Sequence, residues 1–164
     1  MGAIRRLEPT DLPAAVRICN AEIARGGSTW GPVELTADQL GARLSGGPRP
    51  LESWVYEDTP GELAGWGALT SHTQRDIYDT IAEVALFVDE PKRRHGIGRE
   101  LAQHALGRAR ALELRALVVL VQPTPAFLIA WCVRQGFRNV GWLKGVVPVG
   151  AEWRDTLVFQ RTLT

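Results

Sequence analysis

The chain has 164 residues, of which 23% are charged, and its formal net charge is +1. This length suits one domain over residues 1–164, and the balanced charge gives no reason to expect nucleic acid or an anionic membrane as a partner. The two cysteines lack the spacing of metal ligands or of a secreted disulfide framework. Residues 1–10 contain no apolar signal core, and no apolar run approaches the roughly 18 residues of a membrane-spanning helix. We therefore expect a soluble cytoplasmic protein without a bound metal.

The N-terminal third predicts one strand and two helices. Residues 4–7 form a short strand candidate, and Thr10 suits the N-cap of a helix whose apolar positions recur at helical spacing until Gly26. Thr36, with Gln39 three residues later, resembles a capping box and predicts a short helix over residues 36–45.

The middle of the chain predicts three strands. Two of them, Leu51–Glu57 and Glu62–Thr70, flank the turn residues 58–61 and are expected to form an antiparallel hairpin. The third strand, Ile81–Val88, ends before Pro91.

The C-terminal half alternates helices and strands. The expected elements are a helix from Gly96 to about Leu112, a strand over Leu117–Val121, a helix from Thr124-Pro125 to Gly136, and strands over Phe137–Lys144 and Trp153–Arg161. The whole order is strand, two helices, three strands, helix, strand, helix and two strands. Such an order predicts a mixed α/β fold with a central sheet and helices on both sides.

A loop dense in cations and glycines separates the strand that ends at Val88 from the helix that begins near Gly96. It contains Lys92, Arg93, Arg94, His95, Gly96 and Gly98. A helix N-terminus offers unpaired backbone N–H groups and a positive dipole end, and arginines add charge-assisted hydrogen bonds. The loop therefore predicts an anion site, although ordinary surface turns of this composition are common. Its glycines follow neither the Walker pattern nor the dinucleotide-binding pattern.

The same region resembles motif A of the GCN5-related N-acetyltransferase (GNAT) superfamily, Arg/Gln-x-x-Gly-x-Gly/Ala, here Arg93-x-x-Gly96-x-Gly98. The resemblance extends over nearly the whole chain, from the N-terminal helix pair to the Gly136-Phe137 pair. It implies the GNAT fold, which is a mostly antiparallel central sheet of about six or seven strands, splayed around the coenzyme site, with about four helices on both faces. It also implies acetyl-CoA as the acetyl donor.

Three segments further resemble the phosphinothricin acetyltransferase-like branch, whose members acetylate small amino-acid-like amines. They are Asn20-Ala21-Glu22 leading to Ser28-Thr29-Trp30, then Glu83 to Val88, and finally Trp153-Arg154-Asp155-Thr156. The resemblance implies direct acetyl transfer to a primary amine within a ternary complex, and it makes a homodimer an expectation. Two alternatives stay open: acetylation of protein N-termini or lysines, and an acyl-CoA binding module with weak or no catalysis.

For the coenzyme, the resemblance implies backbone groups of one strand, the loop that follows it, and a residue before the last helix. The residues are Leu86, Phe87 and Val88, then Arg93, Arg94, His95, Gly96, Ile97, Gly98 and Arg99, and finally Thr124. The last helix departs from the family, which usually has Asn near its start and Tyr or His two turns later. Here Pro125 and Cys132 stand at those positions.

Two catalytic candidates follow from the resemblance. Glu83 matches the glutamate proposed as the base, and an apolar strand favours this role because burial makes a carboxylate a better proton acceptor. In the alternative, Glu83 faces solvent while Val84, Leu86 and Val88 point inward. Cys132 could protonate the leaving thiolate, or it could be a small buried core residue.

The candidates for contacting the acceptor are Trp30 after the first helix, Arg75 before the Glu83 strand, and Trp153 and Asp155 on the last strand. Arg75 could hold the carboxylate of an amino-acid-like acceptor, and either tryptophan could instead only pack. We expect His104 to be a solvated helix residue. The remaining tryptophans on predicted strands and helices are expected in the core, namely Trp54, Trp66, Trp131 and Trp142.

Overall fold

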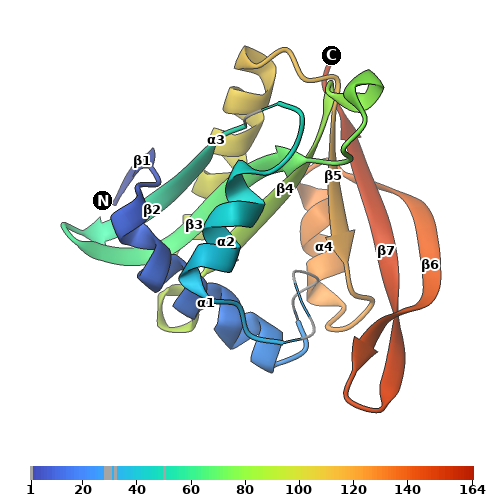
Figure 1. Ribbon diagram of the computed structural model, residues 1–164, viewed down its shortest axis with the longest axis horizontal. Coiled ribbons are helices and arrows are strands. Elements are labelled where there is room, and N and C mark those ends of the chain that lie inside the picture. The colour runs from blue at the N-terminus through green and yellow to red at the C-terminus, as the bar shows by residue number, and fades with distance from the viewer. Residues whose placement is uncertain (1, 28–30, 32, 50) are drawn as a thin grey trace.

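A computed structural model describes residues 2–27, 31, 33–49 and 51–164, and its strands form one seven-stranded sheet in the order β1-β2-β3-β4-β5-β7-β6 (Figure 1). The strands are β1 (Ala3–Arg6), β2 (Ser53–Thr59), β3 (Glu62–Ser71), β4 (Ile81–Val88), β5 (Ala116–Val121), β6 (Arg138–Val149) and β7 (Glu152–Thr162). The helices are α1 (Leu12–Ala24), α2 (Ala37–Ser45), α3 (Ile97–Ala111) and α4 (Phe127–Arg134). Only β4 and β5 pair in parallel among these strands. The mixed α/β fold predicted from the sequence is confirmed.

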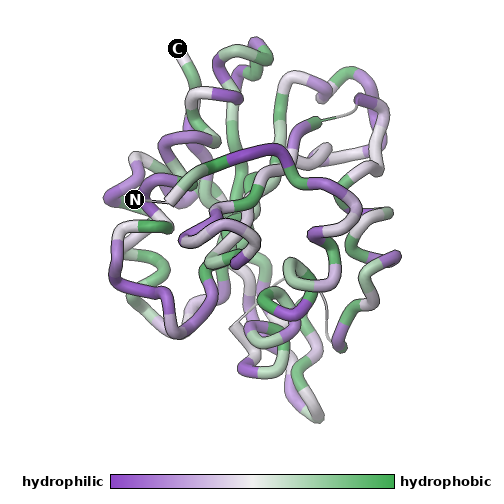
Figure 2. Tube along the Cα trace, turned by 90° about the vertical axis from the view of Figure 1, so that its left-hand side faces the viewer, coloured by the Kyte–Doolittle hydropathy of each residue, from purple (hydrophilic) through white to green (hydrophobic). Residues whose placement is uncertain are grey.

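Helices cover both faces of the sheet, with α1 and α2 on one face and α3 and α4 on the other (Figure 1). On the first face, buried Trp66 of β3 stacks on Phe87 of β4, with ring centroids 4.6 Å apart. The indole N–H of Trp66 also donates to the carbonyl of Ala15 on α1 at 2.9 Å. On the second face, Leu101 of α3 and Cys132 of α4 belong to one apolar cluster. Figure 2 shows hydrophobic stretches along the inner strands and hydrophilic ones on many outer turns.

Strands β4 and β5 separate partway along their length. Their ladder joins Ile81–Glu83 to Ala116–Val118, whereas β5 continues to pair with β7 as far as Val121. β4 in turn stays paired with β3 as far as Val88. The sheet therefore divides beyond Glu83, in the direction of the loop that leads to α3.

Two helix starts differ from the predictions. A 3₁₀ turn at Pro9–Asp11 precedes α1, and the N-cap residue of α1 is Asp11 instead of Thr10. The Asp11 side chain accepts the N–H of Glu8 at 2.8 Å and so caps the 3₁₀ turn. The last helix, α4, begins at Phe127 and not at Pro125. No helix within the described ranges is both long enough and apolar enough to cross a membrane.

The hairpin of β6 and β7 is longer than predicted. β6 continues beyond Lys144 to Val149, through register shifts after Asn139 and Leu143, and tolerates Pro148 because it is an edge strand. The prediction that Trp142 lies in the core is wrong, since its side chain is 59% exposed on this edge strand. Trp54 and Trp66 are buried as predicted, and Trp131 is half-buried.

Candidate active site

Backbone N–H groups face outward at the N-terminus of α3. Gly96 is the N-cap in a left-handed conformation, with φ of +86°, and its carbonyl accepts hydrogen bonds from the N–H groups of Arg99 and Glu100. The N–H groups of Ile97 and Gly98 donate to no acceptor within the described chain. A Cβ atom at position 96 would meet no atom within 4 Å, so a ligand can approach this backbone closely. These features suit an anion such as a phosphate group.

The cations around this N-terminus differ in their partners. Arg93 donates through Nε to the carbonyl of Val88 at 3.2 Å and through a terminal nitrogen to the carboxylate of Glu22 on α1. Arg93 therefore ties the loop to β4 and α1, which is a contact that the sequence did not predict. Arg94 and Arg99 are exposed and form no ion pair with any described residue. The structure thus leaves these two guanidinium groups available to an anion at Gly96.

Two further side chains of the loop bind within the protein. Nζ of Lys92 donates to Asp58 near the end of β2 at 2.7 Å. Nδ1 of His95 lies 3.3 Å from the carbonyl oxygen of Lys92. The Lys92 contact holds the loop against the β2–β3 hairpin, and the His95 contact lies within the loop.

Beyond Glu83, β4 and β5 are no longer paired, and this separation is called the gap. The backbone N–H and C=O groups of alternate β4 residues point into the gap. The N–H of Asp89, which follows β4, donates to the carbonyl of Ala64 in β3, so the backbone groups of Phe87 point toward β3 as well. By the same alternation, those of Val84, Leu86 and Val88 point toward the gap. Of the three residues implied for the coenzyme arm, Leu86 and Val88 are therefore the ones whose N–H groups the gap exposes.

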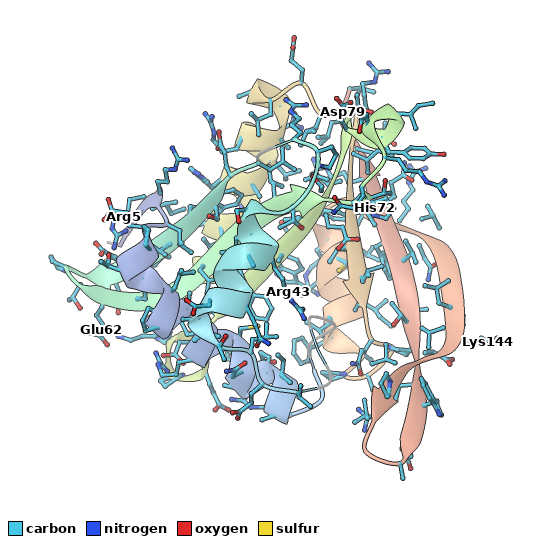
Figure 3. All side chains as sticks on the ribbon, in the orientation of Figure 1. Arg5, Arg43, Glu62, His72, Asp79 and Lys144 are labelled. Atoms are coloured by element: carbon cyan, nitrogen blue, oxygen red, sulfur yellow. The ribbon has the colours of Figure 1, made fainter. Side chains whose placement is uncertain are left out.

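Glu83 opens on a cavity of about 460 Å³ between the sheet and α2. The cavity is also lined by Ala42, Arg43, Gly46, Thr70, Ser71 and Gln74. The Glu83 side chain is 31% exposed, and its Oε1 lies 3.0 Å from Nδ1 of His72 (Figure 3 labels His72 and Arg43). Val84, Leu86 and Val88 pack on the α3 side, as the alternative reading of the strand expected. Glu83 is thus neither deeply buried nor turned to open solvent.

The other acceptor candidates lie apart from this cavity. Arg75 is exposed and, unlike its neighbour Gln74, is not among the lining residues. Trp153 is 68% exposed on β7. Asp155 accepts the indole N–H of Trp142 and the backbone N–H of Gly145, each at 2.8 Å, and these bonds hold the pKa of its carboxyl below the ordinary range. Asp155 therefore stabilises the irregular part of β6. Trp30 lies outside the described residues.

A second cavity, of about 270 Å³, lies between the end of α1 and the tip of the β6–β7 hairpin. Its lining includes Ile23, Gly26 and the buried Gln122, together with residues 147–150 of the hairpin. The hairpin therefore borders this cavity and not the one at Glu83.

The residues near the last helix have contrasting environments. Cys132 is buried in the apolar cluster beneath α3 and α4, and burial raises the pKa of its thiol to about 11. Thr124 is exposed before the helix begins. The prediction of a solvated His104 is wrong. Its ring packs edge-on against Trp54, with ring centroids 4.9 Å apart, and burial lowers the pKa of His104.

The sequence did not single out Arg43 or the partnership of His72 with Glu83. Arg43 belongs to α2, and the sequence predicted this helix from its capping box. The sequence did not indicate which strand end the helix would cover. His72 and Glu83 are separated by a loop of no recognisable motif. Tertiary placement of α2 and of this loop is what assembles the cavity.

Comparison with known proteins decides the family. Residues 21–137 match the model described as the acetyltransferase (GNAT) family. The chain belongs to the GNAT acetyltransferase family. Members of this family use acetyl-CoA, and solved structures with the same fold include acetyl-CoA complexes. The free N–H groups and open glycine at the N-terminus of α3 fit its pyrophosphate.

Individual relatives of this GNAT protein differ in acceptor. It is 28% identical to YwnH of Bacillus subtilis (strain 168), a candidate phosphinothricin acetyltransferase, over 98% of this chain and 99% of YwnH. It is 27% identical to an L-methionine sulfoximine/L-methionine sulfone acetyltransferase of Pseudomonas aeruginosa, over 98% of this chain and 94% of that protein. The crystal structure of a ribosomal-protein-alanine N-acetyltransferase from Brucella melitensis superposes with a TM-score of 0.88 at 25% identity, covering 98% of this chain and 99% of that chain.

Proposed function

We propose that this GNAT enzyme acetylates the primary amine of a small amino-acid-like acceptor. The observation that carries the proposal is the cavity between α2, the end of β3 and Glu83 of β4, which is lined by one carboxylate and one guanidinium. Glu83 is complementary to an ammonium group, and Arg43 is complementary to a carboxylate. Two of the relatives named above are phosphinothricin-type or methionine sulfoximine-type acetyltransferases, which supports the same acceptor class.

The coenzyme would bind along β4 and at the start of α3. The N–H groups of Ile97 and Gly98 and the exposed Arg94 would hold the pyrophosphate, and the backbone of Leu86 and Val88 would pair with the pantetheine arm. One of these strand N–H groups would polarise the thioester carbonyl, an effect typically worth about 3 kcal/mol in the transition state. Thr124 is the proposed hydroxyl contact that replaces the family's usual amide.

Glu83 is the proposed general base. Its carboxylate would accept a proton from the acceptor's ammonium group, and the free amine would then attack the thioester carbon. The carbon–sulfur bond breaks, the amide forms as its nitrogen releases a second proton to water, and the thiolate of coenzyme A takes up a proton. Cys132 is one proposed donor of that proton and water is the other. The burial of Cys132 in the core favours water, because a thiol with a pKa of about 11 is a weak acid.

A screen of small amines with acetyl-CoA and detection of the released thiol tests the proposal. Amino acids and analogues with a free carboxylate, methionine sulfoximine among them, are expected to give thiol release. Glu83→Gln should lower turnover by about a hundredfold or more, whereas Glu152→Gln, on the exposed part of β7, should leave it unchanged. Near-normal turnover by Glu83→Gln would remove the base assignment.

The likeness to a ribosomal-protein-alanine acetyltransferase favours a second candidate acceptor, the N-terminus of a protein. Peptides with N-terminal alanine belong in the same screen. If these peptides are acetylated and amino acids are not, the acceptor is a protein N-terminus. If acetyl-CoA raises the melting temperature but no amine is acetylated, the chain is an acyl-CoA binding module.

A homodimer is also part of the proposal. β6 and β7 expose several large apolar side chains, which are Val140, Trp142, Leu143, Val146 and Trp153. Such a group of exposed apolar residues favours association with another protein surface. Sedimentation measurement of the mass in solution tests the dimer, and a monomer at all concentrations contradicts it.

A further inference from the structure

His72 makes the one side-chain hydrogen bond that Glu83 has with the described residues. Its Nδ1 lies 3.0 Å from Oε1 of Glu83, which is within hydrogen-bonding distance. His72 follows the end of β3, whereas Glu83 lies within β4, so the bond crosses from a loop to the sheet. Nε2 of His72 forms no hydrogen bond with any described residue, and the His72 side chain is 33% exposed.

The two side chains differ in how they meet the cavity. Glu83 lines it and His72 does not. An acceptor that fills the cavity would therefore separate Glu83 from water, while the exposed edge of His72 would stay in contact with solvent. With an acceptor bound, His72 would thus connect the covered carboxylate of Glu83 to solvent.

The charged groups around the pair leave this connection open. Thr70 on β3, Val118 on β5, Gln160 on β7 and Arg138 on β6 share a face of the sheet with Glu83 in one row. Arg43 of α2 faces the same cavity. Arg75, Asp76 and Asp79 lie exposed on the loop that carries His72. Among the described residues, none of these forms a hydrogen bond or an ion pair with Glu83 or His72.

We propose that His72 is the proton exit of Glu83, an inference that rests on the proposed acetyl transfer. Glu83 takes a proton from the acceptor's ammonium group and passes it to Nδ1 of the neutral imidazole. Nε2–H of the resulting imidazolium releases a proton to water, so one proton leaves for each acetyl group transferred. The ring regains its first tautomer by exchange with water. Imidazole suits this task because it gains and loses protons readily near neutral pH.

Three variants separate proton transfer from mere positioning of Glu83. His72→Ala removes both the hydrogen bond and the relay, while the amide of His72→Asn can keep a hydrogen bond to Glu83, as donor or as acceptor, without relaying a proton. Thr73→Ala is the matched control, because it removes only the hydrogen bond that the backbone N–H of Arg75 donates to Thr73 Oγ1 in the same loop. With the best acceptor from the amine screen, both His72 variants should lose about tenfold in kcat. Added imidazole should restore turnover to His72→Ala in a concentration-dependent way, and Thr73→Ala should behave as the wild type.

Other results overturn the proposal. If His72→Asn turns over normally, or if imidazole restores nothing, His72 only positions Glu83. If Glu83→Gln is inactive but both His72 variants are normal, the relay is wrong while the proposed function stands. If the wild type acetylates no amine, the proposed function fails first. The nitrogen shifts of His72 in NMR spectra then still test the contact, since wild type and Glu83→Gln should differ in which ring nitrogen carries the proton, and identical shifts would contradict it.

Discussion

Replacement of Gly96 by alanine tests the coenzyme site most directly, because its effects on folding and on binding differ in size. Gly96 has φ of +86°, and a Cβ there meets no protein atom within 4 Å. The cost to folding is therefore backbone strain alone, roughly 1 kcal/mol, or about 3 °C in melting temperature for a chain of this size. A phosphate seated on the N–H groups of Ile97 and Gly98 would meet the new methyl group. We expect the Kd for acetyl-CoA to rise at least about tenfold, which corresponds to about 1.4 kcal/mol.

The matched control lies in the same helix. Gly107 is exposed within α3, and a Cβ there also meets nothing within 4 Å. Alanine at position 107 should stabilise the protein by about 0.5–1 kcal/mol, because glycine weakens a helix interior, and should leave acetyl-CoA binding unchanged. Calorimetric titration with acetyl-CoA and thermal unfolding of both variants give the two readouts. Wild-type affinity in Gly96→Ala, together with the expected small loss of stability, would refute the assignment of the pyrophosphate to this backbone.

Three further predictions concern the acceptor, the core and the N-terminal turn. Arg43→Ala should raise the KM of a carboxylate-bearing acceptor about tenfold with little change in kcat, and a larger effect from Arg75→Ala would move the carboxylate contact to Arg75. Cys132→Ala should cost about 1 kcal/mol in unfolding free energy and leave turnover unchanged across pH; a loss of turnover would make the thiol a proton donor. Asp11→Asn should cost about 2 kcal/mol, because Asp11 pairs with Arg5 at 2.7 Å and this pairing lowers its pKa. The stabilisation by the ionised Asp11 is complete above the ordinary carboxyl pKa and is lost as the pH falls through the lowered pKa of Asp11. The unfolding free energy of Asp11→Asn, measured by urea unfolding, should therefore fall less steeply at acidic pH than that of the wild type.

Local rules predicted those parts of the fold in which neighbouring residues decide the structure. Thr36 and Gln39 form the expected capping box, and Gly136 ends α4 with φ of +80°. The glycine loop lies at the N-terminus of α3 as its composition indicated. In each case the contact joins residues within one turn of each other, so spacing alone specifies it.

Contacts between distant segments were not predictable in this way. Trp142 and Trp66 are similar in sequence context, but one stands on an edge strand and the other beneath α1, and only the strand order separates them. Arg93 matched a coenzyme motif, yet its guanidinium binds Glu22, which lies 71 residues earlier in the chain. Glu83 was found through resemblance, whereas His72 needed the fold of the loop before β4.

The ion pairs between α1 and the loop before α3 explain how the coenzyme site keeps its form. Arg17 pairs with Asp89 at 3.0 Å, Arg25 pairs with Glu90 at 2.6 Å, and Glu22 pairs with Arg93. Partly exposed pairs of this kind each contribute at most about 1 kcal/mol to folding, so stability alone does not account for three of them on one helix. Their shared effect is to fix the loop between Val88 and Gly96 before any ligand binds. A loop fixed in this way loses less conformational freedom on binding, and more of the binding energy of the pyrophosphate then appears as affinity.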